Sequence, residues 1–314
     1  MTDRLTPIQK ELVIGLTTGA LTTVVIHPLD LIKVRLQLLA TSSQNHGYKY
    51  IFNSMLASAN SSSGRNAAFL KESYRGLGIN LLGNAVAWGL YFGLYRTTKD
   101  VIYGLDKSHV ALDRTNIQKD AALSPLMFLT AGAISGLLTS VLTNPIWVIK
   151  TRIMSTSSRE HNSYKSTKDG IQRLLKEEGP RALWKGLVPS LFGVSQGAIY
   201  FMIYDTLKHR FSSLRHQNES ESRDRSLKNS ETFAISSASK MISVTLVYPF
   251  QLLKSNLQSF EARENNYTIR KLMHSIYANE GLKGFYKGIS ANLLRAVPSS
   301  CITFGIYENL RNWL

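Results

Sequence analysis

The sequence is poor in cysteine, in proline and above all in acidic residues. Its single cysteine, Cys301, excludes an internal disulfide framework and a zinc site built from several thiolates. Only 18% of its 314 residues are charged, against roughly 25% in an average globular domain. The scarcer sign is negative, since 21 Asp and Glu stand against 37 Lys and Arg, a net charge of +16. So basic a chain would suggest nucleic-acid binding, but the low share of charged residues argues against that class.

Charged residues are missing from six long segments. These are residues 12–26, 79–95, 121–149, 186–204, 232–253 (interrupted only by Lys240) and 288–307 (interrupted only by Arg295). A bilayer core about 30 Å thick needs roughly 20 residues of helix, and each segment reaches that length with its flanks. The mean hydropathy is only −0.08, and Thr22, Asn84 and Gln196 lie inside the segments. We therefore predict an all-α membrane protein with six transmembrane helices that face lipid on one side and a wet cavity on the other.

The charges are sorted between the two faces of the predicted membrane protein. The loops 31–78, 150–185 and 254–287 together hold 21 basic and 8 acidic residues, whereas the linkers 96–122 and 205–231 hold 11 basic and 9 acidic residues. The positive-inside tendency places the three loops on the inner side and both termini on the other side. Membrane orientation and binding of anionic lipid, such as cardiolipin, then explain the basic balance, with no nucleic acid as partner. We expect a monomer.

Three short motifs recur in the same order three times. The first reads PLDLIKVR at 28–35, PIWVIKTR at 145–152 and PFQLLKSN at 249–256. The second ends in Gly76, Gly186 and Gly288, and the third places a tyrosine and a base at the end of each even-numbered segment. The pattern predicts three tandem two-helix repeats, at residues 8–103, 123–211 and 231–314.

Over the whole chain these motifs resemble the mitochondrial carrier family. The resemblance implies a pseudo-threefold bundle of six transmembrane helices, with short helices in the matrix loops. It also implies the mitochondrial inner membrane, termini toward the intermembrane space, and transport by alternating access between two gates. An enzyme is not favoured, because we find no nucleophile–base pair, glycine-rich phosphate loop or metal cluster in the sequence.

A matrix gate is predicted at the three prolines, which kink the odd-numbered helices and bring them together. The residues two and five positions after each proline lie on one helix face, which suits an acid and a base. The acid positions hold Asp30, Trp147 and Gln251, and the base positions hold Lys33, Lys150 and Lys254. Only Asp30 with Lys150 is expected to form a full ion pair. In the resembled family a glutamine four residues after the base braces these bridges, which assigns that role to Gln37 and Gln258 but not to Met154.

A second, cytosolic gate is predicted from the third motif. Its charged positions are Lys99, Asp205, Lys208, Glu308 and Arg311. Asp205 and Glu308 are expected to meet Arg311 and Lys99. Arg96 occupies the third acid position, so that Lys208 has no acidic partner.

The substrate is predicted from the two cations inside the charge-free segments. A charge at mid-membrane is costly and normally faces water, a partner or a substrate, so Lys240 and Arg295 together indicate an anionic solute. Lys240 stands where the first and third helices have the packing glycines Gly19 and Gly136, although snorkelling is an alternative for it. The resemblance implies substrate contact points at positions spread over the three even helices: Gly83 and Asn84, Gly193 and Val194, and Arg295. Trp88 is a candidate for stacking on a planar ring, with simple packing as its alternative.

The substrate class follows from a closer resemblance. The strings NAVAWGLYF at 84–92 and LVYPFQLLKSNLQ at 246–258 resemble the family branch that carries folate, FAD, NAD and pyrimidine nucleotides, and within it carriers of FAD. FAD is therefore expected as the transported substrate, with no bound cofactor and no metal. The alternatives are another solute of the same branch, or a membrane scaffold on the same fold that moves nothing.

Overall fold

The computed structural model describes residues 7–39, 47–58, 65–105, 124–157, 160, 163–218 and 229–313, and within these ranges the regular elements are helices. Each repeat has a long helix, shorter helices and a second long helix. The first contains α1 (Pro7–Gln37), α2 (Gly47–Ser58), α3 (Arg65–Ser73) and α4 (Leu77–Leu105). The second contains α6 (Pro125–Ser155), α7 (Thr167–Glu178), the 3-10 helix η3 (Pro180–Trp184) and α8 (Leu187–Asn218). The third contains α9 (Asn229–Gln258), α10 (Phe260–Glu264), α11 (Ile269–Gly284) and α12 (Ile289–Trp313).

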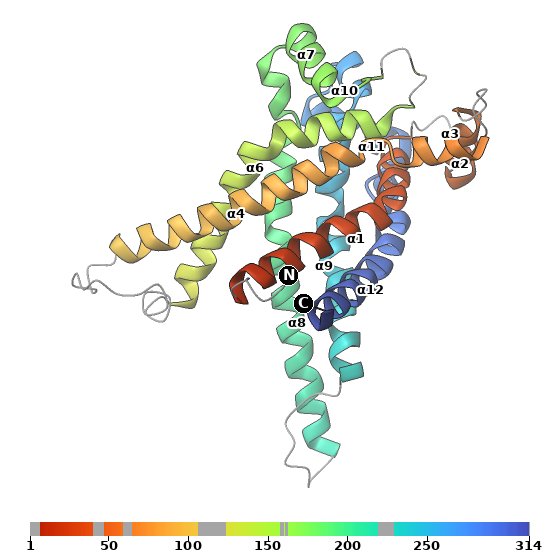
Figure 1. Cartoon of the computed structure of the whole chain (residues 1–314). Helices are drawn as coiled ribbons and strands as arrows, with labels where there is room; N and C mark the ends of the chain where they lie inside the picture. The colour runs from red at the N-terminus through yellow and green to blue at the C-terminus, as the bar shows by residue number, and fades with distance from the viewer. Residues whose placement is uncertain are drawn as a thin grey trace.

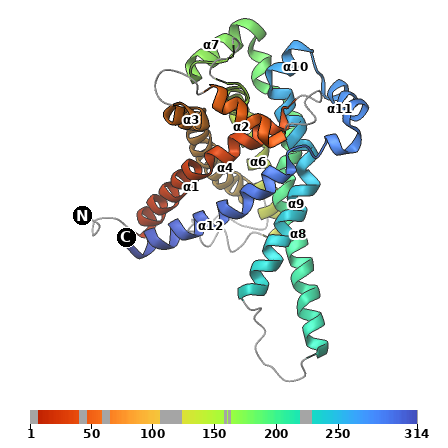
Figure 2. The same cartoon turned by 90° about the vertical axis from the view of Figure 1, so that its right-hand side faces the viewer.

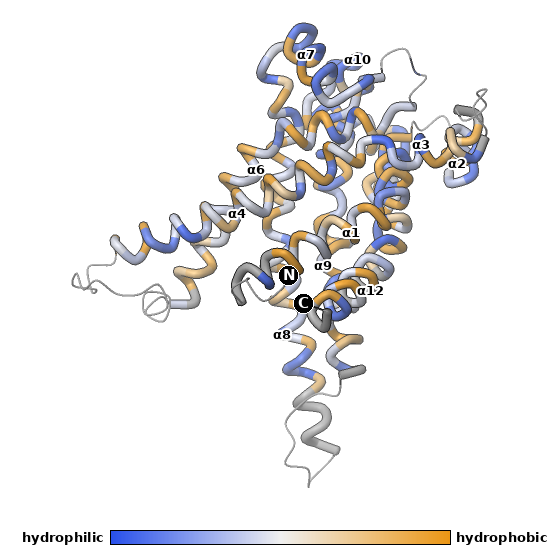
Figure 3. Tube along the Cα trace, in the orientation of Figure 1, coloured by the Kyte–Doolittle hydropathy of each residue, from blue (hydrophilic) through white to orange (hydrophobic). Residues whose placement is uncertain are grey.

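The long helices pair across the repeat boundaries and form three arms: α12 with α1, α4 with α6, and α8 with α9. Figures 1 and 2 show that the arms meet at the end that carries the short helices and spread apart toward the two termini. We call the first the closed end and the second the open end. Hydrophobic residues follow the long helices, whereas α7 at the closed end is mostly hydrophilic (Figure 3).

Five described helices are long and apolar enough to cross a membrane, judged by length and composition. The candidate spans are Val13–Gln37, Asn66–Leu105, Leu126–Ser155, Pro180–Phe211 and Glu231–Gln258. The sixth long helix, α12, is not among them, because polar residues such as Asn292, Arg295 and Glu308 interrupt its apolar sequence. It still lies against α1 in the bundle, so the six-helix architecture expected from the sequence is confirmed.

Counted along the chain, the six long helices are α1, α4, α6, α8, α9 and α12, so the odd helices are the first of each repeat (α1, α6 and α9) and the even helices the second (α4, α8 and α12). The odd helices continue through Pro28, Pro145 and Pro249. The side chain just before each proline bonds to a backbone carbonyl in the turn that precedes the even helix of its own repeat. The bonds run from His27 Nε2 to Arg75 O (3.0 Å), Asn144 Nδ2 to Lys185 O (3.2 Å) and Tyr248 Oη to Lys287 O (2.7 Å). Three different residue types thus donate to the equivalent carbonyl of each repeat. A backbone carbonyl inside a bilayer needs such a donor, because no water is there to supply one.

A glycine follows each of these carbonyls, and its backbone requires a positive φ. Gly76, Gly186 and Gly288 have φ of +82°, +73° and +79°. Space is also tight there, because a Cβ would lie 2.9 Å from Met154, 3.0 Å from the Lys254 carbonyl oxygen and 3.1 Å from the Tyr248 hydroxyl, respectively. The glycines therefore allow the even helices to begin directly against the odd helices of the closed end.

Gly186→Ala is expected to destabilise the protein by about 2–4 kcal/mol, because a left-handed alanine is strained and its methyl group meets rigid backbone. Thermal unfolding of the detergent-solubilised protein measures the effect as a lower Tm. The matched control is Gly197→Ala on the same helix, where a Cβ has nothing within 4 Å. Equal melting temperatures for the two variants would contradict this account of the turn.

Candidate functional site

The closed end is built from a ring of contacts between successive odd helices. From α1 to α9, Gln37 Oε1 accepts a hydrogen bond from Ser255 Oγ (3.0 Å). From α9 to α6, Gln258 Oε1 accepts one from Thr151 Oγ1 (2.9 Å). At the third junction, from α6 to α1, neither hydrogen-bonding side chain is present, and Met154 belongs to an apolar cluster against which Val34 packs.

We call these three pairs the odd-helix ring, and its members occupy equivalent positions in the three repeats. Gln37–Ser255 and Gln258–Thr151 are hydrogen-bonded, and the equivalent positions of the third pair hold Met154 and Val34, which share one apolar cluster. A neighbouring side chain reinforces each junction by donating to a backbone carbonyl: Asn256 to Gln37 (3.2 Å), Arg152 to Gln258 (3.1 Å) and Arg35 to Met154 (3.2 Å). The brace predicted for Gln37 and Gln258 is thus different in detail, since they bond hydroxyl groups of the next odd helix rather than the charged bridges.

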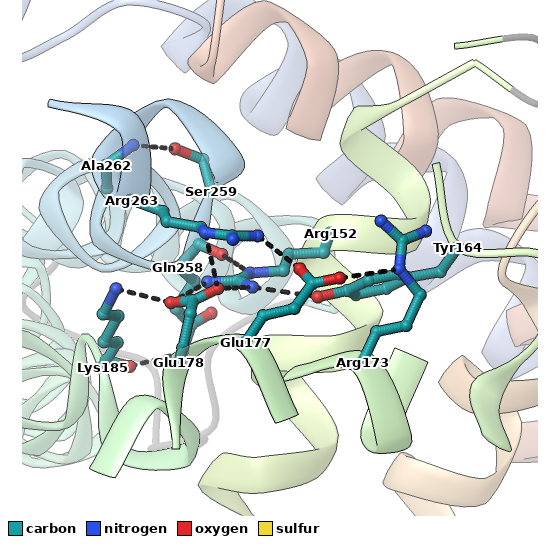
Figure 4. Close-up of polar contacts among 10 residues, drawn as sticks. All are labelled: Arg152, Tyr164, Arg173, Glu177, Glu178, Lys185, Gln258, Ser259, Ala262 and Arg263. Atoms are coloured by element: carbon teal, nitrogen blue, oxygen red, sulfur yellow. Dashed lines mark hydrogen bonds and ion pairs between the residues drawn. The ribbon is translucent and has the colours of Figure 1, made fainter. Parts of the chain in front are cut away.

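Two buried arginines connect the odd-helix ring to the short helices. Arg35 pairs with Glu72 at 2.6 Å, and both side chains are less than 10% exposed. Arg152 is fully buried and forms a two-bond pair with Glu178, which also accepts from Lys185 at 2.7 Å (Figure 4). The third repeat has Asn256 in place of the arginine, and its Glu280 pairs with Lys287 at 3.0 Å.

Burial disfavours the charge on Glu178, but the hydrogen bonds from Arg152 and Lys185 outweigh it and hold the pKa of Glu178 below its ordinary value. Its neighbour Glu177 is more exposed and pairs with Arg173 (3.2 Å) and Arg263 (2.6 Å), as Figure 4 shows. The two adjacent glutamates therefore differ in burial, while both have arginine partners.

Glu178→Gln is expected to lower the free energy of unfolding by about 3 kcal/mol, because it leaves the buried Arg152 guanidinium without a charged partner. The control Glu177→Gln removes only exposed pairs and is expected to cost less than about 1 kcal/mol. Thermal unfolding in detergent compares the two. Equal losses would show that burial of the Arg152 pair does not matter.

The same pair predicts a pH dependence. Because the pKa of Glu178 in the folded protein is depressed, its contribution is complete above its ordinary value of 4.5 and is lost as the pH falls through the lowered value. The Tm of the wild-type protein should therefore drop more steeply below pH 4.5 than that of Glu178→Gln. Parallel pH profiles of the two proteins would refute this assignment.

The charged layer at the matrix gate pairs differently from the sequence-based prediction. Asp30 Oδ1 lies 3.1 Å from Arg295 Nη1 on α12, and this pair replaces the predicted ion pair of Asp30 with Lys150. Lys150 and Lys254 instead lie over the Trp147 ring, with their Nζ atoms 4.8 and 5.9 Å from its centroid. Arg295 comes from α12, the helix that pairs with α1 in one arm.

Two cavities lie between the helices at this layer, and they share Lys33, Val34 and Lys150. The smaller has a volume of about 230 Å³, and its lining is mostly polar: Thr22, Thr23, Asp30, Asn80, Asn84, Arg295 and Ser299 contribute to it. The larger has a volume of about 440 Å³ and is lined by residues that include Trp147, Gly193, Val194, Gln196, Gln251 and Lys254. Gln251 donates to Gln196 at 3.0 Å, an amide pair in the acid position of the third repeat.

The predicted substrate contacts are divided between these cavities and the helix surfaces. Asn84 and Arg295 line the smaller cavity, and Gly193 and Val194 line the larger one. Gly83 faces Ile146 and Trp147 of α6, where it allows close packing. Trp88 is 60% exposed and stacks on Phe92 at 5.6 Å.

Lys240 lies outside the lining of both cavities. Its Nζ is 5.7 Å from the centroid of the Tyr200 ring on α8, the helix that pairs with α9.

The open end does not show the predicted cytosolic gate in a closed state. Asp205, Lys208 and Glu308 are exposed, and neither carboxylate forms an ion pair with another described residue. Lys99 is buried and lies over the rings of Tyr95 and Phe128 rather than against Glu308. Arg96 pairs with Asp100 on its own helix at 3.3 Å, and the side chain of Arg311 lies outside the described residues.

The sequence reasoning missed the three side chains that precede the prolines. His27, Asn144 and Tyr248 share no chemical class, and their one common signal is their position before Pro28, Pro145 and Pro249. It also missed the Gln196–Gln251 pair, although a glutamine inside a charge-free segment is a sign of a wet cavity.

A six-helix bundle of three repeats, closed at one end around prolines and basic residues, is the architecture of a solute carrier. The family model described as mitochondrial carrier protein matches residues 5–105, 122–215 and 225–314, and the chain belongs to this family. It is 54% identical to the mitochondrial FAD carrier protein of Saccharomyces cerevisiae over 310 residues, which covers 98% of each chain.

Two further relatives carry other solutes by name. The chain is 36% identical to the mitochondrial nicotinamide adenine dinucleotide transporter 1 of Saccharomyces cerevisiae, over 96% of this chain and 76% of the relative. It is 35% identical to the chloroplastic folate transporter 1 of Arabidopsis thaliana, over 94% of this chain and 92% of the relative.

Proposed function

We propose that this protein transports FAD across the mitochondrial inner membrane by alternating access, with the three basic loops in the matrix and both termini toward the intermembrane space. The observation that carries the substrate is the 54% identity to a protein named as an FAD carrier, over nearly the whole of both chains. FAD is in this proposal a solute and not a bound cofactor. Basic residues of the loops contact anionic lipid such as cardiolipin, and the working unit is a monomer.

The cavities support an anionic solute. Lys33, Lys150 and Arg295 line the smaller cavity with one acid, Asp30, and Lys254 adds a fourth cation in the larger one. Cations gathered between helices are costly in a bilayer unless water or an anion compensates them. The spreading of the arms toward the termini supports a carrier that is open to the intermembrane space in this proposal.

Trp88 and Lys240 line neither cavity, and their proposed contacts with the solute rest on the chemistry of their side chains. The exposed ring of Trp88 provides a flat apolar face for the isoalloxazine ring of FAD. Lys240 on α9 provides a positive charge for the solute in addition to that of Arg295. The alternative role for Lys240 is packing against the Tyr200 ring.

Uptake into liposomes that contain the purified protein tests the substrate. The panel is FAD, FMN, folate, NAD and pyrimidine nucleotides, each at the same concentration. We expect uptake of FAD above that of every other solute, and empty liposomes give the background. Faster uptake of another member of the panel would replace FAD as the substrate, and uptake of none would favour a scaffold that moves nothing.

Arg295→Ala is expected to weaken FAD affinity about tenfold to a hundredfold, because a charge-assisted hydrogen bond contributes roughly 1.5–3 kcal/mol. Arg295→Lys should recover part of the loss, since an ammonium cannot form the planar two-bond fork. Lys240→Ala should weaken binding as well. The measurement is uptake of FAD and of FMN, normalised to folded protein.

The control for that series is Arg270→Ala, which removes an exposed arginine from α11. In the Arg295 and Lys240 variants, uptake of the diphosphate FAD should fall more than uptake of the monophosphate FMN. The control should lower neither uptake. An unchanged ratio of FAD to FMN uptake in both variants would remove Arg295 and Lys240 from phosphate binding.

A further inference from the structure

In two of the three repeats a buried arginine fills the junction between the odd helix and the short helices. Arg35 and Arg152 each pair with a glutamate of a short helix and donate to a backbone carbonyl at the end of the next odd helix. Each guanidinium also has one further oxygen partner. The full sets are Glu72, Met154 O (3.2 Å) and Thr156 O (3.2 Å) for Arg35, and Glu178, Gln258 O (3.1 Å) and Tyr164 Oη (3.0 Å) for Arg152.

The third repeat has Asn256 at this position, and its shorter side chain keeps only part of the pattern. Its Nδ2 donates to the carbonyl of Gln37 (3.2 Å), as the two arginines do to the equivalent carbonyls, and to the carbonyl of Leu252 (3.0 Å). Both amide hydrogens are thereby used, so Asn256 has no donor for Glu280, the glutamate of this repeat. The place of a guanidinium is left without one.

A cavity of about 90 Å³ lies beside Asn256 at the closed end, between the end of α1 and the helices α9, α10 and α11. One water needs roughly 10–15 Å³ of such space, so the cavity has room for a small solute. It shares only Gln37 with the two cavities at the charged layer. Its lining holds the counterparts of the arginine partners: Glu280 for Glu72 and Glu178, Gln37 for Met154 and Gln258, Leu39 for Thr156, and Tyr267, which precedes α11 as Tyr164 precedes α7.

The charges in this cavity favour a cation. Glu261 and Glu280 contribute two negative charges and Lys287 one positive charge, which leaves a net charge of −1. Lys287 Nζ donates to Glu280 (3.0 Å) and to the Leu39 carbonyl. The carboxylate of Glu261 lines the same cavity, is exposed to solvent and forms no ion pair with another residue that the structure describes.

The lysine on Glu280 does not occupy the place of a guanidinium. In the second repeat Lys185 (2.7 Å) and Arg152 bind Glu178 together, so one glutamate at this position accepts from a lysine and from a guanidinium. A planar guanidinium also matches a carboxylate with two parallel hydrogen bonds, which an ammonium cannot form.

We propose that this cavity binds a small guanidinium compound, whose planar head takes the position in the third repeat that the Arg152 guanidinium has in the second. Glu280 accepts from the head, and Glu261 balances its charge. The bound compound ties α11 to the end of α1, as Arg152 ties α7 to the end of α9, and so stabilises the closed end. Because transport requires this end to open, the compound also slows uptake of the solute; this last step rests on the proposed function.

Thermal unfolding of the purified, detergent-solubilised protein with millimolar methylguanidinium tests the site. The Tm of the wild type should rise saturably, by about 2–4 °C at ten times the Kd. Methylurea has nearly the same shape and no charge, and it should leave the Tm unchanged. Equal shifts with methylguanidinium and methylurea, or no saturable rise with methylguanidinium, would overturn the proposal.

Two variants locate the binding. Glu261→Gln brings the net charge of the cavity to zero and should weaken methylguanidinium binding about fivefold to tenfold. Its matched control is Glu264→Gln, which removes an exposed acid of the same helix α10 that does not line the cavity, and which should bind like the wild type. Asn256→Arg supplies a covalent guanidinium, so it should raise the Tm without any ligand and abolish the response to methylguanidinium.

Equal weakening in Glu261→Gln and Glu264→Gln would show that the compound responds only to surface charge, and an unchanged response in Asn256→Arg would place it elsewhere. Either result would overturn the site. In liposomes, methylguanidinium should slow FAD uptake about twofold in the wild type and not in Glu261→Gln. The Tm measurement involves no FAD, so a Tm shift without FAD uptake by the wild type would refute the proposed function and leave the site standing.

Discussion

A polar group buried away from water needs a partner, and at the closed end of this bundle that partner comes from the next odd-numbered helix. Gln37 is matched with Ser255 and Gln258 with Thr151, and where both hydrogen-bonding side chains are missing, Met154 and Val34 share one apolar cluster. The third junction is therefore a consistent replacement of both partners and not a defect. The turn glycines Gly76, Gly186 and Gly288 pack against Met154, Gln258 and Gln37 of this ring. The same residues therefore fix where the even helices begin.

The consequence for transport is a division of labour between two levels of the closed end. The odd-helix ring and the buried arginine–glutamate pairs hold the three repeats together by uncharged and internally paired groups. The charged layer next to the ring contains one acid, Asp30, and several cations, so its positive charges outnumber its negative charge. This arrangement suits a carrier. An anionic solute can rearrange the charged layer without breaking the hydrogen bonds and ion pairs that hold the odd-helix ring.

Sequence reasoning predicted the helices and repeats well because their signals are long and redundant. Charge-free segments, sorted loop charges and three recurring motifs each indicate the same bundle, and only the polar helix α12 fails a composition test. Pairing within the site was less predictable, because it depends on which side chain reaches which neighbour. Asp30 pairs with Arg295 rather than Lys150, and the equivalent roles of His27, Asn144 and Tyr248 have no common residue type to reveal them.

The central claim is that the closed end is held by matched pairs of the odd-helix ring, and a rescue experiment tests it most directly. Gln258→Met alone leaves the Thr151 hydroxyl, which is only 9% exposed, without its acceptor, at a cost of about 1–3 kcal/mol. Adding Thr151→Val recreates the methionine and valine that occupy the equivalent positions at the third junction, where both belong to one apolar cluster. The measurement is the Tm of the single and double variants in detergent. The account predicts that the double variant regains most of the stability lost by Gln258→Met, and a double variant as unstable as the single one would contradict it.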